Sequence, residues 1–324
     1  MSHALMNTYG TRALTFVRGE GSWLIADDGK RYLDAISGIA VCGLGHAHAG
    51  VAAAIAQQAA TLVHTSNLYN IPQQQKLGTQ LCQLAGMDKV FFGNSGAEAN
   101  ECAIKLARLY GHKKGIDCPV IVVMEKSFHG RTLATLTATG NRKVQAGFEP
   151  LVQGFVRAPY GDVEALKTIA ANNPNVVAVL AEPVQGEGGV NIPAADYLNQ
   201  LRNICDAHQW LLMLDEVQTG NGRTGKYFAY QHNNILPDVV TTAKGLGNGF
   251  PIGACLAQGA AAELFQVGNH GSTFGGSALA CATAQAVVDT LLNEKLIERA
   301  ETLGKKLLAD LQTALVDCSQ VAAV

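Results

Sequence analysis

The stretch Trp210-Leu211-Leu212-Met213-Leu214-Asp215-Glu216 is an apolar run that ends in two carboxylates. Short apolar runs bounded by polar residues are typical of strands buried on both faces of a parallel sheet. Asp215 would then stand at the carboxyl end of such a strand, which is where open α/β sheets bind their ligands.

Further short runs along the chain have the same character. They are Val90–Phe92, Val120–Met124, Val176–Ala181 and Val239–Thr242, and they are followed by Gly93-Asn94-Ser95-Gly96, Phe128-His129-Gly130-Arg131, Glu182-Pro183 and Lys244-Gly245. Stretches with helical periodicity alternate with these runs, a pattern that predicts an α/β domain. Because the carboxyl ends of parallel strands meet at one edge, we expect the polar segments to converge there.

The expected helices lie between and after these strands. They are the part of 61–84 that begins after Pro72, Ala97–Tyr110 with Gly111 as its stop, Tyr197–His208, Ser277–Leu292 and Lys295–Leu315. Near the start, Trp23–Leu33 is expected to form a hairpin that turns at Asp27-Asp28-Gly29-Lys30.

Composition narrows the class of ligand. The chain has 324 residues, 48% of them hydrophobic, a net charge of -2 and 35 glycines, which suits a large globular domain with a smaller part. Without a run of Lys or Arg, it is not expected to bind nucleic acid or a membrane surface. Its apolar runs are far shorter than the roughly 20 residues of a membrane span, and its polar start has no signal core, so we expect a cytoplasmic protein.

The pattern of cysteine and histidine gives no reason to expect a metal. The eight cysteines are scattered without a C-x-x-C pair. His46 and His48 lie in a glycine-rich turn, where two histidines without further ligands are better interpreted as polar loop residues.

The loop after Val90–Phe92 is a candidate phosphate site. Small residues lead from Gly93 into the expected helix, so free backbone N–H groups and the helix dipole would face one point. The alternative is an ordinary helix cap at Asn94 or Ser95.

Asp215 and Lys244 are the candidate catalytic pair. A carboxylate at the end of an apolar strand needs a positive partner, such as a protonated pyridine nitrogen. A helix cap or the magnesium ligand of an NTPase are alternatives, the second weakened because no P-loop motif occurs. Lys244 would ordinarily be a surface lysine, but burial at a strand end would lower its pKa and leave the neutral amine that imine chemistry requires. Glu216 points the other way along the strand and receives no catalytic role.

Arg131 could bind a carboxylate through its planar guanidinium, and Phe128 could lie against an aromatic ring. The alternative is a surface arginine beside a core phenylalanine. The glycines after Lys244 are a poor dinucleotide fingerprint, which argues against a nicotinamide-dependent oxidoreductase.

With these residues in place, the chain resembles the fold-type-I, class III aminotransferases, and within them the bacterial acetylornithine aminotransferases. The blocks that carry the resemblance are 6–10, 94–100, 127–132, 181–189, 214–220 and 271–276. It implies a large domain with a mostly parallel sheet flanked by helices and a pyridoxal 5'-phosphate cofactor held as a Schiff base on Lys244.

The resemblance also implies a role for each site residue. Asp215 would pair with the pyridine nitrogen. Cofactor contacts would come from Ser95, Gly96, Ala97, Phe128, Val217, Gln218 and, across a homodimer interface, Thr273. Arg131, Glu187 and Ser272 would bind substrate.

The implied reaction is transamination of N2-acetyl-L-ornithine with 2-oxoglutarate in arginine synthesis, and succinyl-diaminopimelate is a candidate for a further donor. Ornithine, succinylornithine or 4-aminobutyrate are alternative donors, and an inactive dimerisation module is the alternative from another class. Domain boundaries are expected at 1–49 for the N-terminal segment of the small domain, 50–294 for the large domain and 295–324 for the start of the C-terminal small domain. Relatives are expected to continue past Val324, which would leave Lys295–Leu315 without its usual cover.

Overall fold

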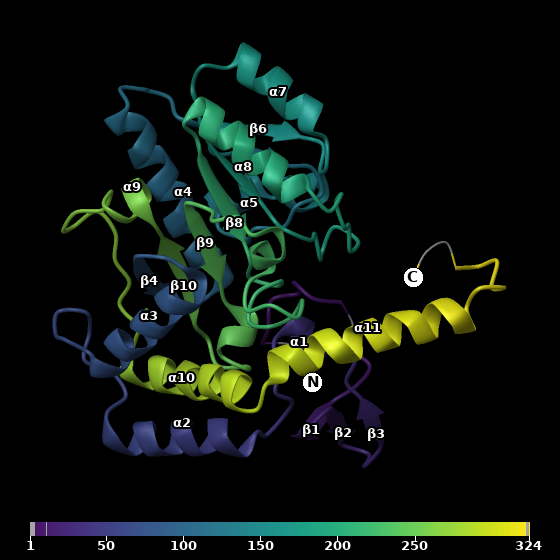
Figure 1. Cartoon of the computed structure of the whole chain (residues 1–324). Coiled ribbons are helices and arrows are strands. Elements are labelled where there is room, and N and C mark those ends of the chain that lie inside the picture. Colours follow the sequence, from purple (N-terminus) through teal and green to yellow (C-terminus); the bar gives the residue numbers. More distant parts are fainter. Residues whose placement is uncertain (1–3, 11, 322–323) are drawn as a thin grey trace.

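One central sheet of seven strands organises the chain, of which the computed structural model describes residues 4–10, 12–321 and 324. The strands are β4 (Lys89–Gly93), β5 (Val120–Met124), β6 (Phe155–Ala158), β7 (Val176–Ala181), β8 (Leu211–Asp215), β9 (Val239–Thr242) and β10 (Gly253–Ala257). Their order is β4-β10-β9-β8-β7-β5-β6, and Figure 1 labels β4, β10, β9, β8 and β6 of this sheet. All neighbouring pairs from β9 to β6 are parallel, whereas β10 is antiparallel to both β4 and β9. The predicted mostly parallel α/β sheet is confirmed.

The predicted strands are all present, with small shifts of their bounds. β5, β7 and β9 begin and end where the apolar runs do. β8 starts one residue later than predicted and includes Asp215 as its last residue. The backbone of Asp215 therefore belongs to the sheet and not to the loop that follows.

Helices cover both faces of the sheet. They are α1 (Ser37–Ala40), α2 (Ala49–Thr61), α3 (Pro72–Ala85), α4 (Gly96–Lys113), α5 (Leu133–Ala138), α6 (Arg142–Gln145), α7 (Val163–Asn172), α8 (Tyr197–His208), α9 (Gly259–Ala262), α10 (Ala278–Asn293) and α11 (Leu296–Ala314), with short 3-10 turns at Ala229–Asn233 and Lys244–Leu246. Alternate residues of β5 face opposite layers: Ile121 and Val123 pack with α4, while Val122 and Met124 face the layer that contains α3, α8 and α10. The sheet is thus buried on both faces, as its apolar strands require.

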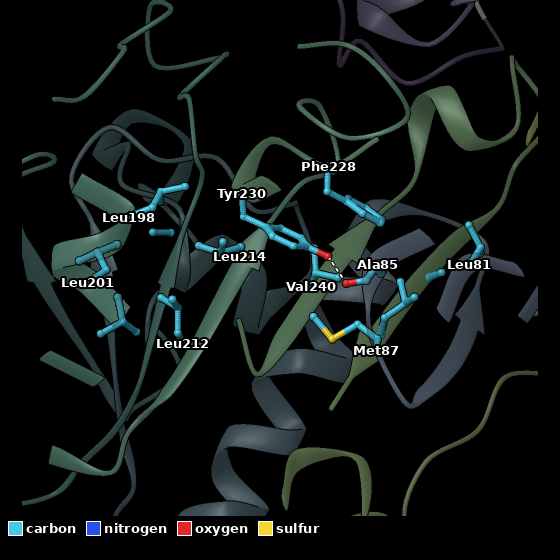
Figure 2. Close-up of a cluster of buried hydrophobic side chains, with 14 of the residues drawn as sticks. Leu81, Ala85, Met87, Leu198, Leu201, Leu212, Leu214, Phe228, Tyr230 and Val240 are labelled. Atoms are coloured by element: carbon cyan, nitrogen blue, oxygen red, sulfur yellow. Dashed lines mark hydrogen bonds between the residues drawn. The ribbon is translucent and has the colours of Figure 1, made fainter. Parts of the chain in front are cut away.

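Figure 2 shows the layer on the α3 and α8 side. Leu212 and Leu214 of β8 point toward Leu198 and Leu201 of α8, and the Tyr230 hydroxyl donates a hydrogen bond to the carbonyl of Ala85 at the end of α3. This packing fixes the strand ends that carry the polar residues.

The predicted end of the helix after β4 is wrong. α4 continues through Gly111 to Lys113, and the Lys114 N–H bonds back to the carbonyl of Tyr110. Gly111 is buried, and a Cβ there would lie 2.6 Å from Pro119 Cβ and 2.9 Å from Val177 Cγ1. The glycine therefore permits close packing against the sheet and does not stop the helix.

A small antiparallel sheet precedes the large one. β1 (Phe16–Glu20), β2 (Trp23–Ala26) and β3 (Arg31–Leu33) pair in order, and Gly29 has a φ of 81° in the turn between β2 and β3. The predicted hairpin and its turn are confirmed.

The last helix, α11, extends away from the main body (Figure 1). None of its residues is fully buried, and Leu303, Leu307, Leu308 and Leu311 are exposed. The assignment of this helix to the start of a C-terminal small domain stays a prediction. In the part of the chain that the structure describes, no helix is long and apolar enough to cross a membrane.

Candidate active site

The polar segments that follow the strands converge on one cavity of about 400 Å³. β4, β5, β7, β8 and β9 each contribute residues from their carboxyl ends, as expected from the sequence. The predicted site residues that line it are Ser95, Gly96, Ala97, Phe128, Arg131, Glu187, Asp215, Val217, Gln218 and Lys244. Val41 and residues 249–252 close the remaining wall.

Asp215 is buried in the cavity and makes three hydrogen bonds. Its side chain is 4% exposed, and one carboxylate oxygen lies 2.7 Å from Asn100 Nδ2 and 2.8 Å from His129 Nδ1. The other oxygen accepts from the Val217 N–H at 3.0 Å. Three hydrogen bonds stabilise the ionised carboxylate and fix its direction.

His129 and Asn100 complete this arrangement, and neither was predicted from the sequence. His129 is buried; burial alone would lower its pKa, but the hydrogen bond and charge of Asp215, together with the charge of Glu182, raise it. Asn100 donates to Asp215 and to the His129 carbonyl and accepts from Thr241 Oγ1 at 2.7 Å. A signal for both existed, because His129 directly follows Phe128 and Asn100 lies one helical turn beyond Gly96.

Lys244 lies two residues beyond the end of β9, at the start of the 3-10 turn Lys244–Leu246, and lines the cavity. Burial lowers the pKa of its amine, although the carboxylates of Glu187, Asp215 and Glu182 oppose that effect. Its φ of 41° places a residue that is not glycine in the left-handed region, which costs conformational energy. Such strain persists only where the surroundings hold it in place.

The start of α4 forms a concave surface of backbone N–H groups. Ser95 is the N-cap, and its hydroxyl accepts from the Glu98 N–H at 3.2 Å, so the predicted alternative of an ordinary cap is correct for this residue. The N–H groups of Gly96 and Ala97 have no partner within the helix, because the first turn of a helix leaves its donors free. A Cβ on Gly96 would lie 2.8 Å from Val217 Cγ1, so only glycine lets the two segments approach this closely.

Phe128 and Arg131, from the segment after β5, also line the cavity. The Phe128 N–H donates to Glu182 Oε2 at 3.1 Å, and the Arg131 guanidinium lies 5.6 Å from the centre of the Phe128 ring. Arg131 is exposed and lines the cavity, so its guanidinium is accessible to a carboxylate. Burial raises the pKa of Glu182 to about 7.

Ser272 and Thr273 are the predicted residues that lie outside this cavity. Ser272 Oγ accepts from the Gly275 N–H at 2.9 Å and lies 3.4 Å from Asn94 Nδ2, which connects its turn to the loop before α4. Thr273 is exposed. Their predicted contribution to a neighbouring subunit stays a prediction.

Glu216 and His46 make their contacts outside the cavity. Glu216 accepts from the N–H groups of Ala229 and Tyr230 and faces away from the cavity, as predicted. His46 lies 2.7 Å from Asp34 in the turn after α1. Among residues 4–10, 12–321 and 324, no group of three His, Cys, Asp or Glu side chains could hold a metal ion.

A family model described as Aminotransferase class-III matches residues 6–324. The chain belongs to the class-III aminotransferases. Among similar proteins is the acetylornithine aminotransferase of Nitrosomonas europaea, 62% identical over 94% of this chain and 77% of that protein.

Two solved structures extend the comparison. The acetylornithine aminotransferase of Elizabethkingia anophelis has a TM-score of 0.88 and 36% identity, over 98% of this chain and 79% of that one. An ornithine aminotransferase from Toxoplasma gondii has a TM-score of 0.92 and 33% identity, over 97% of this chain and 74% of that one. Its structure is described as revealing partial occupancy of PLP at the active site. This class-III aminotransferase therefore depends on pyridoxal 5'-phosphate and acts on amino acids and keto acids.

Proposed function

We propose that this aminotransferase moves the distal amino group of N2-acetyl-L-ornithine to 2-oxoglutarate, giving N-acetyl-glutamate 5-semialdehyde and glutamate. The observation that carries the choice of donor is the 62% identity with the Nitrosomonas acetylornithine aminotransferase over 94% of this chain. The cavity supports it chemically, because it offers an amine, a buried carboxylate and an arginine around one space.

The residues of the cavity fit the cofactor of the family. The free N–H groups of Gly96 and Ala97, beside the hydroxyl of Ser95, would hold its phosphate. Phe128 and Val217 would enclose the ring, and Gln218 would approach the ring hydroxyl. These assignments agree with the close approach of Val217 to Gly96, which leaves little space between the two residues at the start of α4.

Pyridoxal 5'-phosphate supplies an electron sink that stabilises negative charge at the carbon that loses a proton. Lys244 would act as the base, because its lowered pKa keeps a larger fraction of Nζ neutral and able to accept that proton. Asp215, fixed by His129 and Asn100, would keep a negative charge against the protonated ring nitrogen.

Arg131 and Glu187 would recognise the substrates at the cavity mouth. The Arg131 guanidinium suits a carboxylate through two parallel hydrogen bonds. Glu187 borders the same cavity and would distinguish a donor that carries a distal amine from glutamate.

A panel of donors tests the substrate assignment. Purified enzyme with added cofactor and 2-oxoglutarate should use N2-acetylornithine with the highest kcat/KM, ahead of ornithine, succinylornithine and 4-aminobutyrate. The rate with succinyl-diaminopimelate shows whether the enzyme has a second activity. A higher kcat/KM for ornithine or 4-aminobutyrate would overturn the assignment, and no turnover with any donor would favour a non-catalytic module.

We also propose that the enzyme is a homodimer with shared active sites. Asn67 Nδ2 donates to the carbonyls of Ser272 and Gly275 at 3.0 Å each, which joins the segment around residue 67 to the turn at residues 272–275. Leu68, Tyr69 and Phe274 expose 87%, 69% and 63% of their area there, which is unusual for large apolar side chains on a free surface. Thr273 of the partner subunit would contact the cofactor phosphate.

Mixed dimers test the sharing of residues. A Lys244→Ala chain should be inactive alone and a Thr273→Arg chain only weakly active. Activity should be regained when the two chains are unfolded and refolded together, because one site of the mixed dimer then has both residues intact. No recovery in verified mixed dimers would mean that Thr273 serves its own Lys244.

We place the enzyme in the cytoplasm. The eight cysteines are all free in the described residues, and free thiols suit a reducing compartment. Cell fractionation that found the activity outside the cytoplasm would contradict this location.

A further inference from the structure

The backbone that presents Lys244 is in an uncommon conformation. Ala243 has φ -167° and ψ -135°, and Lys244 follows with φ 41°. These torsions are set by the orientation of the peptide group between the two residues, because ψ of Ala243 and φ of Lys244 are rotations on either side of it. Whatever holds that peptide group therefore also sets the direction of the Lys244 side chain.

Asn221 contacts that peptide group from the loop after β8. Its Nδ2 donates to the Ala243 carbonyl at 3.1 Å and to Thr242 Oγ1 at 2.9 Å. The Leu246 N–H donates to the same Ala243 carbonyl at 2.8 Å. The carbonyl is thus held from two directions, and the side-chain contact comes from a residue more than twenty positions earlier in the chain.

Asn221 is itself suited to this position. Its φ of 57° lies in the left-handed region, which asparagine adopts more readily than most residues. A Cβ on Gly245 would lie 3.3 Å from Asn221 Cβ, so the side chain packs directly beneath the Lys244 turn. Asn221 lines a second, smaller cavity together with Gly245 and is not among the residues that line the catalytic cavity.

We propose that Asn221 is a positioning residue, which locks the Ala243–Lys244 peptide and so aims the Lys244 amine into the catalytic cavity. The inference rests on the proposed function, since it concerns the lysine to which that function assigns the chemistry. A misplacement of a reacting group by about 1 Å can cost roughly a hundredfold in rate, so the loss of this contact should be visible in turnover.

The variant Asn221→Gly removes the amide and keeps a residue that tolerates the positive φ. We expect kcat to fall by about 10- to 100-fold, with little change in the KM for the amino donor. Asn234→Gly is the matched control, because Asn234 has a similar φ of 52° and is exposed on the surface. It should keep wild-type kcat.

A second measurement follows Lys244 without turnover. Cofactor-free enzyme is mixed with pyridoxal 5'-phosphate, sampled over time and reduced with borohydride, and the modified lysine is identified by mass spectrometry of its peptide. Modification of Lys244 should be at least severalfold slower in Asn221→Gly than in wild-type or Asn234→Gly protein. Thr242→Val, which removes the other acceptor, should slow it in the same direction, and Thr242→Ser should restore the rate.

The outcomes separate the two proposals. Modification of another lysine in wild-type protein would defeat the assignment of Lys244 itself. Modification of Lys244 at equal rates in wild-type and Asn221→Gly protein, with unchanged kcat, would overturn the role of Asn221 alone. If Asn221→Gly does not fold, the Thr242→Val variant decides. A kcat and a Lys244 modification rate equal to those of wild-type protein would then overturn the role of Asn221.

Discussion

Asp215 and His129 form a buried pair, with Asp215 Oδ2 2.8 Å from His129 Nδ1. A carboxylate can only accept a hydrogen bond, so His129 must carry its proton on Nδ1 while Asp215 is ionised. His129 Nε2 is buried without a partner among the described atoms. The histidine therefore serves Asp215 and holds its charge in one place.

Replacing Asp215 with alanine should leave Lys244 able to bind the cofactor but should lower kcat by about two to four powers of ten, since roughly 3–5 kcal/mol of charge interaction is removed. Stopped-flow and steady-state kinetics with saturating cofactor measure the loss. A fall of less than tenfold would show that Asp215 does not face the cofactor ring.

Replacing Lys244 with alanine should abolish turnover and the yellow colour that borohydride removes. No other lysine is among the residues that line the cavity of the described chain. Absorbance spectra before and after borohydride check the colour. Turnover of the variant at the wild-type rate would contradict the assignment.

Gly96→Ala should weaken cofactor binding by about tenfold or more, because the added methyl group meets Val217 at 2.8–2.9 Å and must displace it or the helix start. Titration of cofactor-free protein followed by absorbance gives the Kd. Gly304→Ala is the control, since a Cβ there meets nothing within 4 Å. An unchanged Kd for Gly96→Ala would remove Gly96 from the phosphate site.

Arg131→Lys keeps the charge but loses the planar pair of donors, so the KM for the amino donor and for 2-oxoglutarate should rise about 10- to 100-fold with a smaller change in kcat. Arg142→Lys, at an exposed arginine of α6, is the control. A larger fall in kcat with unchanged KM would place Arg131 at the reacting centre instead.

The strand ends were predictable because five strands are short apolar runs, and burial on both faces of a sheet demands such runs. β10 and β6 were not predicted. Gly253–Ala257 is rich in small residues, and Phe155–Ala158 is an edge strand interrupted by Arg157, so neither has a distinctive pattern.

Contacts between segments far apart in the sequence were the second feature that could not be predicted. The sequence placed Asp215 and Lys244 correctly near strand ends. Asn100 and His129 lie close in sequence to predicted site residues, but nothing in the sequence specified that they would bond to Asp215 or that Asn221 would reach Ala243. These contacts depend on side-chain directions that only the assembled sheet defines. The domain boundaries at residues 49 and 294 stay a prediction.

Glu216 lies beside Asp215 in sequence but serves the fold. It is completely buried, and it accepts from the N–H groups of Ala229 at 2.8 Å and Tyr230 at 2.9 Å and from Thr219 Oγ1 at 2.8 Å. Burial raises its pKa to about 7 from an ordinary value of 4.5, against the opposing effect of these hydrogen bonds. Below pH 4.5 the group is protonated in both the folded and the unfolded chain. As the pH rises toward 7, the unfolded chain ionises first and is favoured.

The Glu216 contribution to stability should therefore be fully present below about pH 4.5 and should be lost by about pH 7, a change of about 3 kcal/mol in the free energy of unfolding. Glu216→Gln should be less stable overall, because a neutral amide offers one acceptor oxygen to three donors, but its free energy of unfolding should fall less between pH 5 and 8. Urea unfolding across that range measures the difference, with Glu164→Gln on an exposed face of α7 as the control. Parallel pH curves for Glu216→Gln and wild-type protein would mean that Glu216 is ionised throughout and that the three hydrogen bonds outweigh its burial.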